Sequence, residues 1–231
     1  MPKLIAQMVA RDEGSRFLSE VLDHLRPLVD VIVFTDDAST DNTLAVAKSF
    51  DCETYESTWD ESQFSINEGQ LRQEAWKNLE KHAEWGDWIL AIDADEKLFA
   101  PVPIREYVQR QTSVDVLGIT FFHMWNRSQY RVDRAWRPSL SSRLFRYYPN
   151  GQFNLRKLAC GSEPTYVQDS IRMGRVNWNT NFRMQHLGYV KDDDKEAKYD
   201  RYMVLDGGDF HSRAHIQSIM DPNPVLEYWR Q

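Results

Sequence analysis

Residues 29–43 read VDVIVFTDDASTDNT, and this stretch decides the fold. Residues 29–34 are too continuously apolar to keep one face in water, which is typical of a strand covered on both sides in a parallel sheet. The residues that follow are Asp, Ser, Thr and Asn, which favour turns and helix starts. We therefore expect a buried strand that ends in a polar turn, followed by a helix over residues 44–50.

Similar units lie on both sides of this stretch. An apolar run at residues 4–10 precedes a helical spacing of apolar residues over 17–25. Further along, a weaker strand over residues 52–55, a helix over 68–83 and a fourth apolar strand over 88–92 complete the rhythm. This alternation predicts an α/β fold, an open and mostly parallel sheet of Rossmann-like type flanked by helices.

The second half of the chain is less regular. We expect a helix over residues 103–110, a long strand over 114–125 and a last helix over 194–205, whereas residues 126–181 show no clear period. Without a repeat or a linker-like stretch, residues 1–231 are expected to form one domain with an elaborated C-terminal half.

Composition narrows the functional class. The chain has 231 residues, 42% of them hydrophobic, with 28 Lys and Arg against 35 Asp and Glu, a net charge of −7. These values exclude a disordered chain and argue against a general nucleic-acid binder. No apolar run approaches the ~20 residues of a membrane span, and the opening residues lack signal-peptide features. The two distant cysteines, Cys52 and Cys160, are expected to be buried thiols in a reducing compartment, so we expect a cytoplasmic protein, free or peripheral to a membrane.

Four polar clusters follow the predicted strands, where open α/β sheets bind ligands. They are residues 11–13, residues 36–37, Arg72 and residues 93–96. Turn chemistry alone can explain any one of them, but their convergence on one sheet edge favours a site. Since no glycine-rich phosphate loop follows the first strand, backbone amides are not expected to hold phosphate.

The acidic cluster DADE at residues 93–96 suggests a metal. Asp93 and Asp95 lie two apart, so both point to one side of an extended strand, and Glu96 follows in the turn. Carboxylates repel a phosphorylated ligand unless a divalent cation lies between them, and hard oxygen ligands suit Mg²⁺ or Mn²⁺. The alternative is an acidic helix cap at Asp95 and Glu96.

These motifs resemble those of family 2 glycosyltransferases of the GT-A fold. Residues 8–43 resemble the opening of that family, with Asp36, Asp37, Ser39, Asp41 and Thr43 in its D-D-x-S-x-D-x-T pattern. WILAIDADE (88–96) resembles its D-x-D segment, and FSINEGQLRQEAW (64–76) resembles the stretch where an Arg approaches the nucleotide. The resemblance covers about residues 3–100 and continues weakly at RLFR (143–146) and HLGY (186–189).

The resemblance implies an inverting, metal-dependent transferase of a sugar, a hexose by preference, from a nucleoside-diphosphate sugar to an acceptor hydroxyl. It assigns residues 1–100 to the donor and metal and residues 101–231 to the acceptor. The implied donor contacts are Ala10, Arg11, Glu13, Asp36, Asp37, Arg72, Asp93 and Ala94. The implied ligands of Mn²⁺ or Mg²⁺ are Asp93, Asp95 and His186, although a histidine in a loop is as often purely structural.

The general base is expected opposite the leaving diphosphate. Relatives carry a His-Glu pair after RLFR, and this chain has Ser162-Glu163, so the resemblance points to Glu163, with a surface glutamate as the alternative. Arg143 and Arg146 are candidates to assist the diphosphate or the acceptor. We expect both on one face of a strand, where ordinary solvation explains them equally well.

Other readings stay open. A sugar nucleotidyltransferase would carry a glycine-rich basic loop after the first strand, and a non-catalytic sugar-nucleotide or glycan-binding protein would show a damaged acidic motif. His211 and His215 lie four apart and could share a helix face. No carboxylate lies between them, which argues against a metal site there. A UDP-sugar is the favoured donor. The sequence leaves four kinds of acceptor open: a glycan, a lipid-linked saccharide, a protein and a modified nucleic-acid base.

Overall fold

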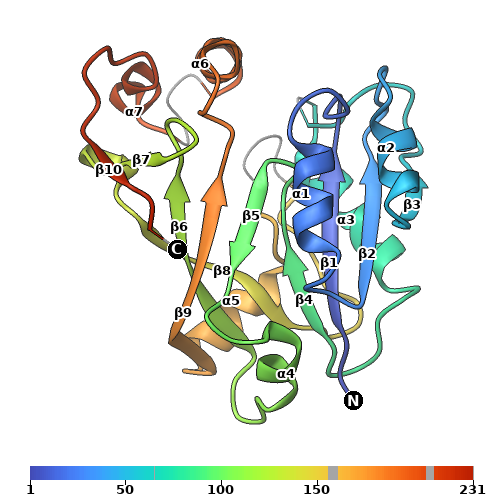
Figure 1. The fold of residues 1–231 in the computed structure, drawn as a ribbon. Coiled ribbons are helices and arrows are strands. Elements are labelled where there is room, and N and C mark those ends of the chain that lie inside the picture. Colours follow the sequence, from blue (N-terminus) through green and yellow to red (C-terminus); the bar gives the residue numbers. More distant parts are fainter. Residues whose placement is uncertain (65, 156–160, 207–210, 231) are drawn as a thin grey trace.

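The computed structural model describes residues 1–64, 66–155, 161–206 and 211–230 (Figure 1). An eight-stranded sheet runs through both halves of the chain in the order β3-β2-β1-β4-β8-β6-β9-β5. Its strands are β1 (Leu4–Ala10), β2 (Val31–Asp36), β3 (Glu53–Glu56), β4 (Trp88–Ala91), β5 (Glu96–Phe99), β6 (Val116–His123), β8 (Ser139–Arg146) and β9 (Val176–His186). A separate two-stranded ladder joins β7 (Gln129–Arg131) to β10 (Leu226–Tyr228).

The sheet is curled and mostly parallel. Strands β3, β2, β1 and β4 pair in parallel, as do β6 and β9, whereas β8 is antiparallel to both of its neighbours and β5 is antiparallel to β9. In Figure 1 the arrows of β1, β4, β6 and β9 all point toward the top of the view, and α6 lies above the ends of β6 and β9.

Helices cover both faces of the sheet. They are α1 (Leu18–Leu25), α2 (Thr43–Ser49), α3 (Glu68–Leu79), α4 (Ile104–Gln109), α5 (Thr165–Arg172), α6 (Asp192–Leu205) and α7 (Arg213–Ser218), with a short 3₁₀ turn at Arg134–Trp136. Alternate residues of β1 divide between two cores. Leu4, Ala6 and Met8 pack with α1 and α4, and Ile5 packs with α3 and α5. The prediction of strands buried on both faces is thereby confirmed.

The elements predicted over residues 4–92 are present, with shifted ends. The strand expected from residue 29 begins at Val31, and the helix expected to reach residue 83 ends at Leu79. Hydrophobic spacing locates an element, but its end depends on local hydrogen bonding that the spacing does not carry.

The second half differs more. The strand expected over 114–125 spans Val116–His123, and the last helix begins two residues early, at Asp192. The stretch without a period contains β7, β8, α5 and most of β9. Their apolar and polar positions do not alternate cleanly, since β9 carries buried polar side chains such as Thr180 and Gln185.

Strand β5 was not predicted, and it determines the geometry of the DADE turn. The chain leaves β4 in the middle of the sheet after Ala91 and enters β5 at the sheet edge at Glu96. Because the sheet curls, four residues bridge this distance. In the ladders, His186 of β9 pairs with Glu96 of β5 on one side and with His123 of β6 on the other.

Two further expectations concern compartment and membrane. Cys52 is a half-buried free thiol, and burial raises its pKa to about 12, while Cys160 lies outside the described residues. Among the helices of the described ranges, none combines the length and the apolar character needed to cross a bilayer.

A buried carboxylate ties the second half together. Asp115, only 3% exposed, precedes β6 and accepts hydrogen bonds from Arg175 Nη2 (2.8 Å) and the Tyr148 hydroxyl (2.8 Å). Burial raises the pKa of this carboxyl, but these donors outweigh burial and hold the pKa below its ordinary value of 3.8.

We predict that Asp115→Asn lowers the free energy of unfolding at pH 7 by about 1–3 kcal/mol, because charge-assisted hydrogen bonds are lost. Since the pKa is lowered in the folded protein, this stabilisation is present above the ordinary pKa and is lost as the pH falls through the folded pKa. Urea unfolding at pH 7 and at about pH 3 tests both statements. A deficit of equal size at the two pH values would contradict the assignment.

Candidate active site

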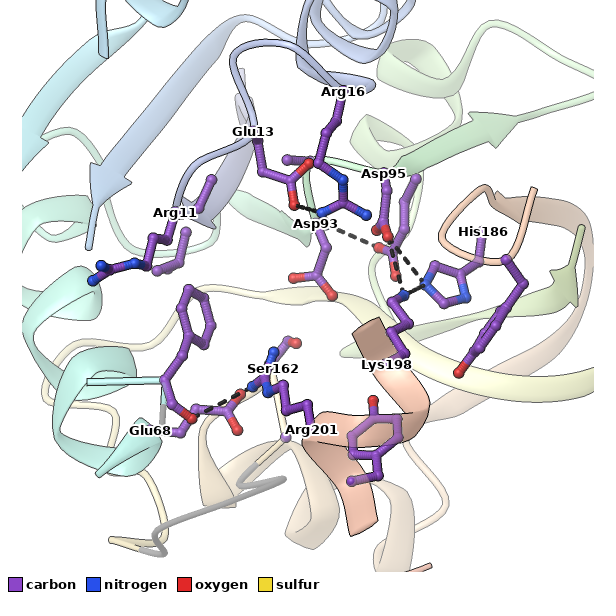
Figure 2. A pocket seen from close by; sticks show the side chains of 18 of the residues that line it. Arg11, Glu13, Arg16, Glu68, Asp93, Asp95, Ser162, His186, Lys198 and Arg201 are labelled. Carbon is purple, nitrogen blue, oxygen red and sulfur yellow. Dashed lines mark hydrogen bonds and ion pairs between the residues drawn. The ribbon is translucent and has the colours of Figure 1, made fainter. Parts of the chain in front are cut away.

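A cavity of about 790 Å³ opens at the carboxyl ends of β1 and β4. Both halves of the chain line it. The predicted site residues that lie in its wall are Ala10, Arg11, Glu13, Arg72, Asp93, Ala94, Asp95 and His186. Figure 2 shows Arg11 on the opposite side of this cavity from His186. The structure therefore brings together residues that are up to 176 positions apart in the chain, from Ala10 to His186.

Asp36 and Asp37 do not line the cavity. Both are buried behind its wall, where the carboxylate of Asp37 accepts hydrogen bonds from the Ser62 hydroxyl (2.6 Å) and the amides of Gln63 (2.9 Å) and Phe64 (3.2 Å). Asp36 accepts from the Ser39 amide (2.9 Å). Because Ser62 and Phe64 line the cavity, Asp37 shapes the wall instead of contacting the cavity directly.

Glu163 also lies outside the cavity wall, although its neighbours Gly161 and Ser162 are part of it. The Glu163 carboxylate accepts a hydrogen bond from the Ser142 hydroxyl (3.0 Å), one residue before Arg143 on β8. Its negative charge also acts on Arg143. The predicted base thus borders the cavity from behind β8.

Arg143 neutralises part of the DADE turn. Its Nη1 lies 3.0 Å from the Asp93 carboxylate and 2.6 Å from both Glu96 oxygens, while Arg72 Nη2 lies 3.6 Å from Asp93. Burial raises the pKa of Glu96, and the guanidinium of Arg143 opposes this.

Arg146 takes no part in the cavity. Its side chain donates hydrogen bonds to the carbonyls of Val114 and Gly86 and lies over Trp88. The expectation that both arginines share one strand face was wrong, because residues three apart in a strand point to opposite faces.

Asp95 and His186 converge on one point, and a lysine ammonium occupies it. Asp95 Oδ2 and His186 Nε2 are 3.3 Å apart, and Lys198 Nζ of α6 lies 3.3 Å from the first atom and 3.1 Å from the second (Figure 2). The amide of Leu187 holds the Asp95 carbonyl at 2.7 Å. A Cβ on Gly188 would come within 2.0 Å of Lys198 Nζ and 2.4 Å of Asp95 Oδ2, so only glycine allows this close approach.

A second histidine orients the first. The Nδ1 atoms of His123 and His186 are 3.0 Å apart, so one ring must donate to the other. Because the ammonium of Lys198 can only donate, the network assigns the lone pair of His186 to Nε2 and its proton to Nδ1, which donates to His123. This tautomer directs an acceptor nitrogen toward Asp95.

The ionisation states agree with this network. Burial and the charge of Lys198 lower the pKa of His186, so its ring is neutral near pH 7. Burial raises the pKa of Asp95, but the charge of Lys198 opposes burial, and the pKa stays well below the ordinary range. Burial, opposed by Arg16 and reinforced by Asp95, raises the pKa of Glu13 to about 7.

Basic residues balance the carboxylates, and the sequence analysis did not select three of them, Arg16, Lys198 and Arg201. The described lining includes six basic residues, Arg11, Arg16, Arg72, Arg143, Lys198 and Arg201. It includes five acidic ones, Glu13, Glu68, Asp93, Asp95 and Glu96, which gives a formal sum of 6 − 5 = +1. The argument that this edge repels phosphate without a divalent cation therefore does not hold.

Three cavity residues on α6 were detectable from the sequence. Lys198, Arg201 and Tyr202 follow helical spacing on a helix with no fully buried residue, so a polar face must serve a purpose other than core packing. His211 and His215, which the sequence did not favour as metal ligands, also line the cavity. His211 Nδ1 lies 2.6 Å from the buried Asp206 carboxylate.

The fold is that of GT-A glycosyltransferases, as predicted. The chain superposes on Staphylococcus aureus TarS (residues 1–349) in complex with UDP with a TM-score of 0.55 and 17% identity, covering 94% of this chain and 69% of that one. It superposes on the mannosyltransferase PcManGT of Pyrobaculum calidifontis, in complex with GDP-Man and Mn²⁺, with a TM-score of 0.56 and 14% identity, covering 97% and 66%.

Sequence similarity points the same way over a shorter range. An uncharacterized glycosyltransferase of Rickettsia felis is 28% identical over 98 residues, which is 42% of this chain and 30% of the relative. The chain therefore matches less than a third of that relative's length. No protein-family model matches the chain.

We predict that Arg143→Met lowers the free energy of unfolding by about 3–5 kcal/mol, because it leaves the Asp93 carboxylate and the buried Glu96 carboxyl without the guanidinium that contacts both. Arg110→Met is the matched control, since Arg110 pairs with Glu106 on the exposed surface and its loss should cost less than about 1 kcal/mol. Urea unfolding of both variants measures the difference. Equal effects of the two substitutions would show that Arg143 does not compensate buried charge.

Proposed function

We propose that the protein transfers a sugar from a nucleoside-diphosphate sugar to an acceptor hydroxyl, with inversion at the anomeric carbon. The observation that carries the proposal is the convergence of Asp95 Oδ2 and His186 Nε2, 3.3 Å apart, in a cavity of about 790 Å³ within a GT-A fold. The cavity lies where open α/β sheets bind ligands and has the volume of a small-molecule site.

The donor is held by basic and apolar groups on the side of β1 and α3. Arg11 and Arg72 contribute positive charge toward the diphosphate, and the end of β1 at Ala10 forms the floor. Asp37 keeps the segment with Phe64 in place. The UDP named for TarS and the GDP-Man named for PcManGT support a nucleotide-sugar donor. We propose a UDP-hexose as the first donor to test.

The residues at the convergence point fit a divalent cation such as Mn²⁺ or Mg²⁺. A carboxylate oxygen and an unprotonated imidazole nitrogen face each other there, and His123 fixes the tautomer of the second. Within the described residues no cluster of three or more His, Cys, Asp or Glu side chains has metal-holding geometry. Donor phosphates commonly supply the other ligands of such cations.

When bound, the metal neutralises charge on the leaving diphosphate. Asp95 and His186 would hold it, and Asp93, fixed by Arg72 and Arg143, would orient the donor. The Mn²⁺ named for PcManGT supports this part of the proposal.

Glu163 is the proposed base that takes the proton from the acceptor hydroxyl as its oxygen attacks the anomeric carbon. Its hydrogen bond with Ser142, which precedes Arg143 of the cavity wall, and its position directly after the lining residue Ser162 support this role. We assign residues 1–100 to donor and metal binding and residues 101–231 to the acceptor, within one domain in the cytoplasm.

We predict that Asp95→Asn abolishes metal-dependent binding of the donor nucleotide, because one of two protein ligands loses its charge. Calorimetric titration with UDP, GDP, CDP and dTDP, each with and without Mn²⁺, measures this in the wild type and the variant. Asp23→Asn, an exposed change on α1 outside the cavity wall, serves as the control. Equal Mn²⁺-dependent binding by wild type and Asp95→Asn would refute the metal assignment.

We predict that Glu163→Gln slows sugar transfer by roughly 10²–10⁴-fold while donor affinity is kept, as for the loss of a general base. Glu84→Gln, an exposed change of the same kind far from the cavity, should leave the rate unchanged. A near-wild-type rate for Glu163→Gln would assign the base elsewhere. His211, held by Asp206 in the cavity wall, would be the residue to substitute next.

A further inference from the structure

We propose that Lys198 and a divalent metal ion are alternative occupants of one cation position, so that the lysine sets how much metal the protein needs. The inference rests on the proposed function only in taking Asp95 and His186 as the metal ligands. It concerns a residue that neither the sequence motifs nor the resemblance selected.

The ammonium already uses the atoms that a metal would need. Lys198 Nζ lies 3.3 Å from Asp95 Oδ2 and 3.1 Å from His186 Nε2, and these two atoms face each other at 3.3 Å. A metal bound to both would lie within van der Waals contact of this ammonium. Two like charges at such a separation repel strongly inside a protein, so one must leave when the other binds.

The backbone leaves no room for both. Gly188 closes the third side of the position, so closely that even a methyl group there would overlap the ammonium, the carboxylate and the imidazole. The ring of Tyr189 flanks the lysine, with its centroid 4.7 Å from Nζ. Lys198 is thus held tightly while it occupies the position, and the Lys198 side chain is only 20% exposed.

A second acceptor lies within the same cavity. Glu13 Oε2 is buried and has no hydrogen-bond partner among the described residues, and the charge of Lys198 acts on the Glu13 carboxyl. A displaced ammonium can therefore turn from Asp95 toward this oxygen of Glu13, whose other oxygen pairs with Arg16. The helix that carries Lys198, α6, has no fully buried residue, so a side-chain rotation there disturbs little packing.

The direct test is Mn²⁺ binding without any nucleotide, read from the electron paramagnetic resonance signal of free Mn²⁺. We expect Lys198→Met to bind Mn²⁺ at least about tenfold more tightly than the wild type, because the competing charge is gone. Lys198→Arg, which keeps the charge, should bind within about threefold of the wild type.

Lys195→Met is the matched control. Lys195 lies one turn earlier on α6, pairs with Asp192 at 2.8 Å and is absent from the cavity wall. This variant should bind Mn²⁺ as the wild type does. The proposal is overturned if Lys198→Met binds Mn²⁺ no more tightly than the wild type, or if Lys198→Arg gains as much affinity as Lys198→Met.

A second readout follows the lysine itself in the wild-type protein. Acetylation of individual lysines by an amine reagent, measured by mass spectrometry, should be slow at Lys198 without metal and faster at saturating Mn²⁺, with Lys195 unchanged. By thermodynamic linkage, if Lys198 weakens metal binding at this position, bound metal weakens the contacts of Lys198 by the same factor. Unchanged labelling of Lys198 while Mn²⁺ is bound would overturn the exchange.

Neither measurement needs a donor, an acceptor or turnover. A protein that shows the exchange but no sugar transfer would retain this inference and lose the proposed function. If the protein transfers sugar but Lys198→Met does not gain Mn²⁺ affinity, the proposed function is retained and this inference is lost.

Discussion

Charge compensation in the DADE turn is the constraint on which the rest of the structure depends. The turn places three carboxylates, Asp93, Asp95 and Glu96, at the closed end of a cavity, and Glu96 is only 1% exposed. Carboxylates in such a place are stable only when each has a cation close by. Arg143 serves Asp93 and Glu96, and Lys198 serves Asp95. Both cations come from the second half of the chain, and Arg72 of the first half lies 3.6 Å from Asp93, so both halves contribute to charge compensation in the turn.

This dependence explains which parts of the fold were predictable. Strands β1, β2 and β4 lie in the centre of one half of the sheet and are buried on both faces, so each is a continuous apolar run that can be read from the sequence. Strand β9 instead alternates irregularly and buries Thr180 and Gln185, and the Thr180 hydroxyl donates to the Gly118 carbonyl of β6. Hydrophobic spacing cannot report such a strand.

The same division holds for the site. Residues that follow a strand at a fixed offset, such as Glu13, Asp93 and Asp95, were found because their place follows from the strand. His123 and Lys198 depend on pairing between β6 and β9 and on the docking of α6, which are long-range relations. Asp36 and Asp37 also follow from the strand, at the end of β2, but their side chains turn toward the backbone of neighbouring segments and stay behind the cavity wall.

The position of β5 gives the site an unusual mechanical character. This strand has four residues, lies at the edge of the sheet and pairs only with β9 in its ladder, where Glu96 stands opposite His186. Short edge strands open more readily than central ones, since only one neighbour holds them. If β5 peels away, Asp95 and His186 separate while β1, β2 and β4 keep their core. Local opening of this edge can therefore separate Asp95 from His186 without global unfolding. A cation bound between these two side chains stabilises the closed edge.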